Sequence, residues 1–168
     1  TGRRSIAFVG GPFDIRQVND RLAGARAAAE NATAQIGLEI VATAAMTVEQ
    51  GVEAGARILA RPRREWPDAL FAANDLLALG LLQSIVGDGR AAVPDDIAII
   101  GFDDIPFAED LAPPLTPVRQ PLIEKGRLAA AVLALEPRQR DVLLLRHFEG
   151  ASLTAIARRL GRATATVH

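Results

Sequence analysis

Short apolar runs alternate with helical patterns through the first hundred residues, and this alternation is the strongest constraint on the fold. The runs are four or five residues long and are bounded by Gly, Pro or polar residues, which is typical of buried parallel strands. They are residues 5–9, 38–41, 69–73 and 97–100. The segments between them are long enough for crossover helices, which parallel neighbours require. We therefore predict an α/β fold, a parallel sheet with flanking helices, through about residue 105.

The predicted helix after the second run has clear boundaries. Thr47 and Gln50 have the spacing of a capping box, in which each side chain bonds the other residue's backbone N–H. The helix is expected to end before Pro62, because Pro cannot continue it. Its predicted inner face consists of Val48, Val52, Ala56 and Leu59. The helices on either side are predicted to bury Val18, Leu22, Ala25 and Ala29, and Leu76, Leu79 and Leu82.

Polar residues follow two of the apolar runs where the predicted strands end. Asn74 and Asp75 come after the third run, and Asp103 and Asp104 come shortly after the fourth. The carboxyl ends of parallel strands line the ligand crevice of an open α/β sheet. An amide offers both a donor and an acceptor, and a carboxylate accepts paired hydrogen bonds. These residues therefore predict a binding site for a small polar molecule at this edge.

Composition excludes several classes of function. The 19 basic and 20 acidic side chains nearly cancel, so the whole chain has no charge excess that would bind nucleic acid or membrane. Without cysteine there is no disulfide or thiolate chemistry. His147 and His168 are too few and too isolated for a metal site or a catalytic dyad, and Gly10-Gly11 lacks the G-x-G-x-x-G spacing of a dinucleotide site. We expect no enzyme activity and no cofactor.

Two further expectations concern the location and extent of the chain. No apolar run approaches the roughly 20 residues that cross a bilayer, and no signal sequence opens the chain. We therefore expect a soluble, cytoplasmic protein without membrane contact. Because the sequence begins with Thr1 rather than Met, we also expect a fragment of a longer protein.

The pattern changes beyond the fourth run. A loop without regular structure is predicted from Pro106, Pro113, Pro114 and Pro117. Residues 122–134 are rich in Ala and Leu and predict a helix. Pro137 suits the first turn of another helix, Ser152 is a good N-cap for a third, and Gly161 is its natural stop. Helices separated by short Gly-containing turns indicate a helix-turn-helix.

Five collinear motifs resemble the lactose-repressor/galactose-repressor (LacI/GalR) family across residues 1–132. They are residues 21–24 (RLAG), 72–80 (AANDLLALG), 93–97 (VPDDI), 101–107 (GFDDIPF) and 114–121 (PLTPVRQP). The resemblance implies half of a periplasmic-binding-protein-like clamp, in which two α/β subdomains close on a small effector. It further implies that this chain holds the second subdomain plus a returning strand and helix that belong to the first.

The resemblance also implies an effector site. Arg21 matches the family's effector-binding arginine, Asn74 its ligand-binding amide and Asp103 its hydroxyl-accepting carboxylate. Gln120 matches a common contact on the returning segment. Met46 stands where relatives often carry an aromatic residue that stacks on the ligand, and Met offers no flat face for such stacking.

The tail resembles a second family, region four of bacterial sigma factors, over residues 133–168. The matching sequences are residues 135–150 (LEPRQRDVLLLRHFEG) and 152–162 (SLTAIARRLGR). Ala155 replaces the usual Glu, and Ala163 replaces the usual Ser or Thr cap of the recognition helix, which is soon cut off. The resemblance implies DNA contacts, mainly to phosphates. The implied contact residues are Arg158, Arg159, Arg162, Thr164 and Thr166.

These observations predict three parts: an effector-binding subdomain (1–120), a connecting helix (121–135) and a truncated helix-turn-helix (136–168). The predicted function is a DNA-binding transcriptional regulator that responds to a sugar-like or nucleoside-like effector. DNA would be bound by the tail or by an N-terminal domain outside this sequence, and an intact relative would be a homodimer. Three alternatives stay open: a sugar receptor of periplasmic type without a DNA role, an enzyme on this scaffold, and a misjoined chain.

Overall fold

The computed structural model describes residues 2–103, 105, 115–147 and 152–161. The chain divides into two compact units, Thr1–Gln120 (unit 1) and Pro121–His168 (unit 2). Arg162, Thr164 and Thr166, three of the DNA-contact candidates, lie outside the described residues. Pro106, Pro113 and Pro114 of the predicted loop also lie outside them.

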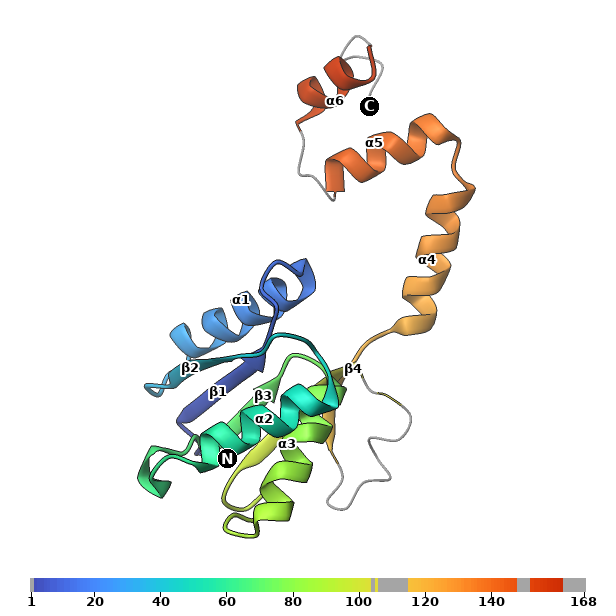
Figure 1. The fold of residues 1–168 in the computed structure, drawn as a ribbon. Helices are drawn as coiled ribbons and strands as arrows, with labels where there is room; N and C mark the ends of the chain where they lie inside the picture. The colour runs from blue at the N-terminus through green and yellow to red at the C-terminus, as the bar shows by residue number, and fades with distance from the viewer. Residues whose placement is uncertain (1, 104, 106–114, 148–151, 162–168) are drawn as a thin grey trace. The chain divides into compact units, whose positions relative to one another are not determined.

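Unit 1 is built on one five-stranded parallel sheet, which confirms the predicted α/β fold (Figure 1). The strands are β1 (Ser5–Gly10), β2 (Gly37–Ala42), β3 (Ala69–Ala72), β4 (Ala98–Asp103) and β5 (Thr116–Arg119). Their order across the sheet is β2-β1-β3-β4-β5. Strands β1 to β4 correspond to the four predicted runs. The central strands are nearly continuous apolar runs because both of their faces are buried.

The fifth strand differs from the sequence-based expectation. The sequence places Pro117 in a loop, whereas β5 pairs in parallel with β4 and places Pro117 opposite Gly101. A proline has no N–H to donate, so it is tolerated in a strand at the edge of a sheet. The order of strands places β5 at such an edge. The sheet therefore extends to within one residue of Gln120.

Helices cover both faces of the sheet. The helix α1 (Arg16–Glu30) lies on one face, and α2 (Val48–Leu59) and α3 (Asp75–Asp88) lie on the other (Figure 1). A short 3-10 turn, η1 (Arg63–Glu65), precedes β3. The α1 prediction is confirmed at Val18 and Leu22, which are buried.

The predicted inner face of α2 is wrong at Val52 and Ala56, which are exposed, and is confirmed at Leu59, which is buried. The residues that α2 buries are Gly51, Ala54, Gly55, Ile58 and Leu59, whereas Val52 is 36% exposed. The reason is the close approach of α3, because a Cβ added to Gly80 would lie 2.8 Å from the Cα of Gly51. Small residues permit this approach, and the larger valine is directed outward. In α3, likewise, Leu76 is 38% exposed while Leu77 is fully buried.

Helix caps follow the sequence signals in part. The Thr47 Oγ1 accepts a hydrogen bond from the Gln50 N–H at 3.4 Å, but the Gln50 side chain accepts from the Ala44 N–H at 2.8 Å. Only half of the predicted capping box therefore forms. The Asn74 side chain caps α3 by accepting from the Leu77 N–H, and Gly89 ends that helix with a φ of 74°.

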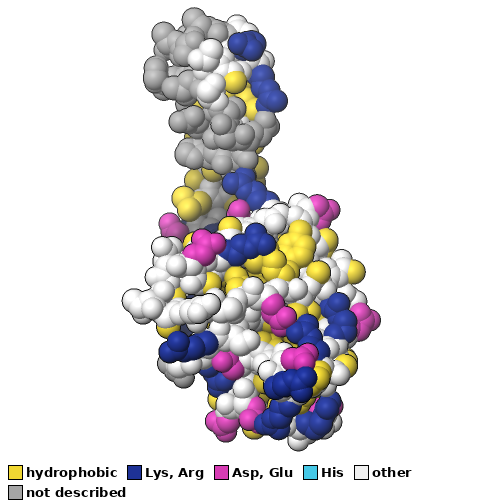
Figure 2. All heavy atoms as spheres, turned by 90° about the vertical axis from the view of Figure 1, so that its left-hand side faces the viewer, with side chains coloured by type: hydrophobic (Ala, Val, Ile, Leu, Met, Phe, Trp, Pro, Cys, Tyr) yellow, Lys and Arg dark blue, Asp and Glu magenta, His cyan; other side chains and the backbone are white. Residues whose placement is uncertain are grey.

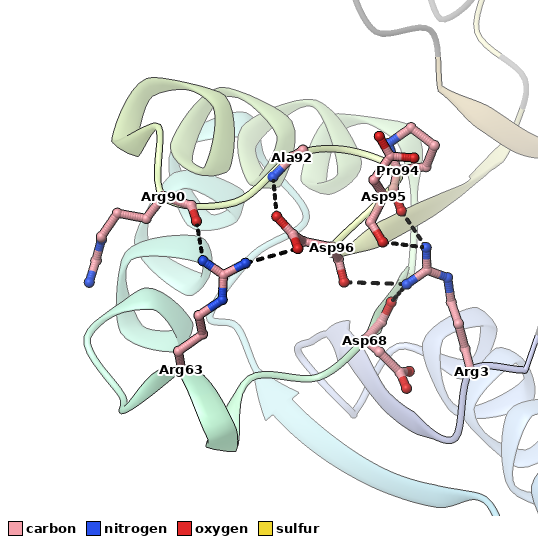
Figure 3. A network of polar contacts seen from close by, with 8 residues as sticks. All are labelled: Arg3, Arg63, Asp68, Arg90, Ala92, Pro94, Asp95 and Asp96. Atoms are coloured by element: carbon pink, nitrogen blue, oxygen red, sulfur yellow. Dashed lines mark hydrogen bonds and ion pairs between the residues drawn. The ribbon is translucent and has the colours of Figure 1, made fainter.

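The amino-terminal edge of the sheet is tied together by arginines (Figure 3). The Arg3 guanidinium donates to the carbonyls of Asp68 and Asp96, and Arg63 Nη2 lies 2.8 Å from Asp96 Oδ1. The Ala92 N–H donates to the other Asp96 oxygen at 2.9 Å. This backbone hydrogen bond, with the nearby Arg63 charge, lowers the pKa of Asp96. The segments that enter β1, β3 and β4 are thus held side by side.

Unit 2 contains α4 (Leu122–Ala134), α5 (Pro137–His147) and α6 (Leu153–Arg159). Ser152 caps α6 as predicted, accepting from the Ala155 N–H at 3.2 Å, and Gly161 follows with a φ of 64°. A small core joins α5 and α6, formed by Val142, Leu145, Ile156, Ala157 and Leu160. Within the described parts of the chain, the helices are too short or too polar to cross a bilayer.

Candidate functional site

Three of the five candidate ligand residues meet at the carboxyl-terminal edge of the sheet. Arg21 comes from α1, Asp103 is the last residue of β4, and Gln120 follows β5 directly. The Arg21 Nη2 lies 3.0 Å from Asp103 Oδ1, and Gln120 Nε2 donates to the same oxygen. In the described part of the chain, both hydrogen bonds to the Asp103 carboxylate go to Oδ1, which leaves Oδ2 for another donor.

Arg21 is held from three directions. Its Nη1 donates to the Ala73 carbonyl, its Nη2 pairs with Asp103, and its guanidinium carbon lies 4.1 Å from the centre of the Phe102 ring. That position over the ring is favourable because the face of an aromatic ring is electronegative. The Arg21 side chain is only 10% exposed, against 32% for Asp103. The arginine is therefore oriented before any ligand arrives.

Asn74 and Met46 form a second pair beside the first. The Asn74 Oδ1 accepts from the Leu77 N–H at 2.9 Å, and its Nδ2 donates to the Met46 carbonyl at 3.1 Å. Asn74 directly follows Ala73, the residue whose carbonyl binds Arg21, so the two pairs share one sheet edge. The Met46 side chain packs against the hydrophobic core of unit 1. The Met46 contact with Asn74 is thus made by its backbone.

The backbone of Asp103 has an uncommon conformation. Its φ is 114°, in a region that residues with a Cβ rarely adopt. Such a conformation costs about 1–3 kcal/mol and persists only where surrounding contacts hold it. Strain of this kind is concentrated at functional sites, which makes Asp103 the most distinctive residue of this edge.

A match to a known family covers unit 1 and extends into unit 2. Residues 1–142 match the family described as Periplasmic binding protein-like domain. A regulatory protein of the LacI family from Chloroflexus aggregans is 37% identical, with a TM-score of 0.69 over 83% of this chain and 51% of that one. The chain belongs to the LacI-type family of periplasmic-binding-protein-like domains.

Two further proteins that are similar to this LacI-type chain are described with ribose in their names. The ribose operon repressor of Escherichia coli is 39% identical over 132 residues, which are 79% of this chain and 39% of that protein. A LacI-family regulator from Enterococcus faecium, solved with bound ribose, is 28% identical, with a TM-score of 0.67 over 90% of this chain and 51% of that one. The chain thus spans about two fifths of the length of the curated relative.

Residues 125–168 of the LacI-type chain match a second family, described as Sigma-70, region 4. The two matches overlap over residues 125–142, which include most of α4 and the first half of α5. In α6, Arg158 and Arg159 are exposed, while Ile156 and Ala157 are buried against α5. Both described arginines among the DNA candidates therefore lie on the outer side of the helix pair.

Sequence reasoning missed two contributors to the LacI-type site. The Phe102 ring supports Arg21 and stands in a row with Phe71, at 6.4 Å between ring centres, and Phe71 contacts Phe8 at 5.4 Å. Phe71 pairs with Ile100, so the two-residue alternation of strands places Phe102 on the face of Phe71, but this register is known only from the structure. The other contributor, the Ala73 carbonyl, carries no sequence signal.

Proposed function

We propose that this chain is part of a DNA-binding transcriptional regulator of LacI/GalR type, in which unit 1 binds a small polyhydroxylated effector. The observation that carries the proposal is the pairing of Arg21 with Asp103 at the carboxyl edge of the sheet, beside Asn74. A charged donor and a charged acceptor from different elements meet where open α/β sheets bind ligands. The repressors among the relatives support the regulatory role.

Each residue has a distinct task in this proposal. Asp103 accepts a ligand hydroxyl at Oδ2, and the N–H groups of Arg21 that do not bond Ala73 or Asp103 donate to ligand oxygens beside it. Gln120 and Asn74 offer amide groups that both donate and accept. Met46 contributes no flat surface for stacking, so the ligand would be held mainly by hydrogen bonds. A vicinal diol fits this arrangement best, because its adjacent hydroxyls can meet one acceptor and one donor together.

The proposed regulation is a shift of conformational populations. An effector that binds the closed clamp more tightly than the open one favours closure, by no more than the difference between the two affinities. Closure would then alter the DNA affinity of a DNA-binding element, which is unit 2 or a domain outside this sequence. We propose no enzyme activity, a cytoplasmic location, a homodimeric intact protein, and domains at residues 1–120, 121–135 and 136–168.

Unit 2 is the part of this chain that is proposed to bind DNA. On the face drawn in Figure 2, the acidic and basic side chains of unit 1 are interspersed rather than gathered by sign. Such a surface offers no extended positive field to a phosphate backbone. Arg158 and Arg159 on α6, in the segment that matches sigma region 4, are the described residues best suited to phosphate contacts.

The test is a titration with D-ribose followed by NMR and calorimetry. Unit 1 supplies one wall of the two-walled clamp, so we expect weak binding without a resolvable calorimetric signal at micromolar protein. At millimolar ribose, the resonances of the Arg21 Nε–H, Asp103 and Gln120 should shift, and Asp103→Asn should abolish the shifts. Asp95→Asn, at an exposed residue of the opposite edge, is the matched control. Shifts that arise elsewhere, or a tight calorimetric complex, would contradict the proposal.

A further inference from the structure

We propose that Asp75 is a positioning residue for Asp103, holding the end of β4 in the conformation that presents the Asp103 carboxylate to Arg21. The inference rests on the proposed effector site, but the contacts that support it are internal to unit 1. It gives a shared purpose to Asp75, the second residue of the motif 74–75, and Asp103, the central residue of the motif 101–105.

Asp75 is the most deeply buried acidic residue among those described. It is 0% exposed and is the first residue of α3. One carboxylate oxygen, Oδ2, accepts a hydrogen bond from the Ile105 N–H at 2.9 Å. Ile105 lies two residues beyond Asp103, so this bond holds the chain just after the strained residue.

Gly101 brings the same carboxylate against β4 on the other side of Asp103. A Cβ added to Gly101 would overlap Asp75 Oδ1 and would lie 3.2 Å from the carboxyl carbon. Only a glycine permits this approach. Asp75 therefore contacts the chain two residues before Asp103, within β4, and two residues after it, just beyond the strand.

This double contact accounts for the backbone of Asp103. A φ of 114° is not held by sheet geometry, because an extended strand has a negative φ. The bond to Ile105 pulls the chain toward α3 while the Asp103 side chain points to Arg21 on the opposite face of the sheet. The backbone changes direction at Asp103, and the contacts at Gly101 and Ile105 stabilise its strained conformation.

Burial of a carboxylate is costly, and the location of Asp75 reduces that cost. The first turn of a helix carries unsatisfied N–H groups and a partial positive charge, which favour an anion. The hydrogen bond from Ile105 adds a further donor. Asn74 already supplies the helix cap through Leu77, so a capping role does not explain Asp75. Its position is explained by the loop that it holds.

The experiment compares Asp75→Ala and Asp75→Asn with wild type in the absence of ligand. The backbone coupling between the amide and α protons of Asp103 reports its φ, and the Arg21 Nε–H resonance reports the pairing with Asp103. We expect Asp75→Ala to raise the coupling toward that of an extended strand, to shift the Arg21 resonance and to remove exchange protection of the Ile105 amide. Asp75→Asn should restore all three signals, because its side-chain oxygen can still accept from Ile105.

The control is Asp95→Ala, at an exposed acid remote from β4's carboxyl end, which should leave the three signals unchanged. Should Asp75→Ala not fold, Asp75→Ser replaces it, since serine suits a first helical turn but is too short to reach Ile105. A folded variant without the carboxylate whose Asp103 coupling and Arg21 resonance match wild type would overturn the proposal. Because no ligand is present, this result is independent of whether ribose binds.

Discussion

Arg21 on α1 and Asp103 at the end of β4 are 82 residues apart in the sequence, and their charged groups lie 3.0 Å apart. The contact joins the helix on one face of the sheet to the carboxyl end of a central strand. It does so at low exposure, where charge pairs are less screened by solvent. The strength of this link and of its supports can be measured.

Replacing Arg21 with Met should destabilise unit 1 by about 1–2 kcal/mol, since the partly exposed Asp103 carboxylate loses its charged partner. The measurement is urea unfolding, in which all variants are fitted with one common dependence of the unfolding free energy on urea concentration. Arg16→Met is the matched control on the same helix, because Arg16 and Asp20 form an exposed pair at 3.5 Å. The control should change the unfolding free energy by less than about 0.5 kcal/mol. Equal effects at both positions would show that the Arg21 contact is no stronger than a surface pair.

Replacing Phe102 with Leu should loosen Arg21 without removing its partners. We expect a loss of about 1–2 kcal/mol in stability, from the cation–π contact and from reduced packing. The Arg21 Nε–H resonance should also move, because this proton loses the ring-current shift from Phe102. Phe102→Tyr keeps a ring face and should preserve both properties. An unchanged Arg21 resonance in the Leu variant would mean that the ring does not orient the arginine.

Gly80→Ala should be among the most damaging small substitutions in unit 1. The added methyl would overlap the Val48 carbonyl and press on Gly51, forcing α2 and α3 apart at a cost of about 3 kcal/mol or more. Gly24→Ala on α1 is the matched control, because nothing lies within 4 Å of its Cβ position. The control should stabilise by about 0.5–1 kcal/mol through helix propensity. Thermal or urea unfolding distinguishes the expected loss of stability in Gly80→Ala from the expected gain in Gly24→Ala.

The amino-edge network should contribute pH-dependent stability through Asp96. Its pKa is lowered in the folded protein by the Ala92 N–H and by Arg63, from an ordinary value of 3.8. A lowered folded pKa stabilises the fold above 3.8, and this stabilisation is lost as the pH falls through the folded value. The stability difference between wild type and Asp96→Asn should therefore be largest near neutral pH and shrink below pH 3.8. A difference that is independent of pH would contradict this account.

Arg158→Ala should weaken the binding of a random DNA duplex by this chain. Loss of one phosphate contact should reduce the slope of log affinity against log salt by about one. Arg26→Ala, an exposed arginine on α1, is the control and should leave the slope unchanged. Electrophoretic mobility shifts at several salt concentrations provide the measurement. Equal losses at both positions would indicate a diffuse charge effect rather than a site on α6.

The sequence by itself determined the elements and their caps. The alternation of apolar runs with helical patterns predicted four of the five strands, because strand burial and helix amphipathicity are written into local spacing. Ser152 was recognisable as a cap for the same reason, since a cap depends on residues only three positions away. The residues that meet at the carboxyl edge of the sheet were foreseen through the resemblance to a family.

Tertiary structure decided the rest. The buried face of α2 follows from its contact with α3, so the small residues Gly51 and Gly55 turn inward although Val52 is more hydrophobic. Pro117 lies in a strand because β4 offers it an edge. The burial of Asp75, the φ of Asp103 and the support of Arg21 by Phe102 depend on residues that are distant in the chain. Local pattern cannot encode these features, because each is set by which surfaces the completed fold brings within contact distance.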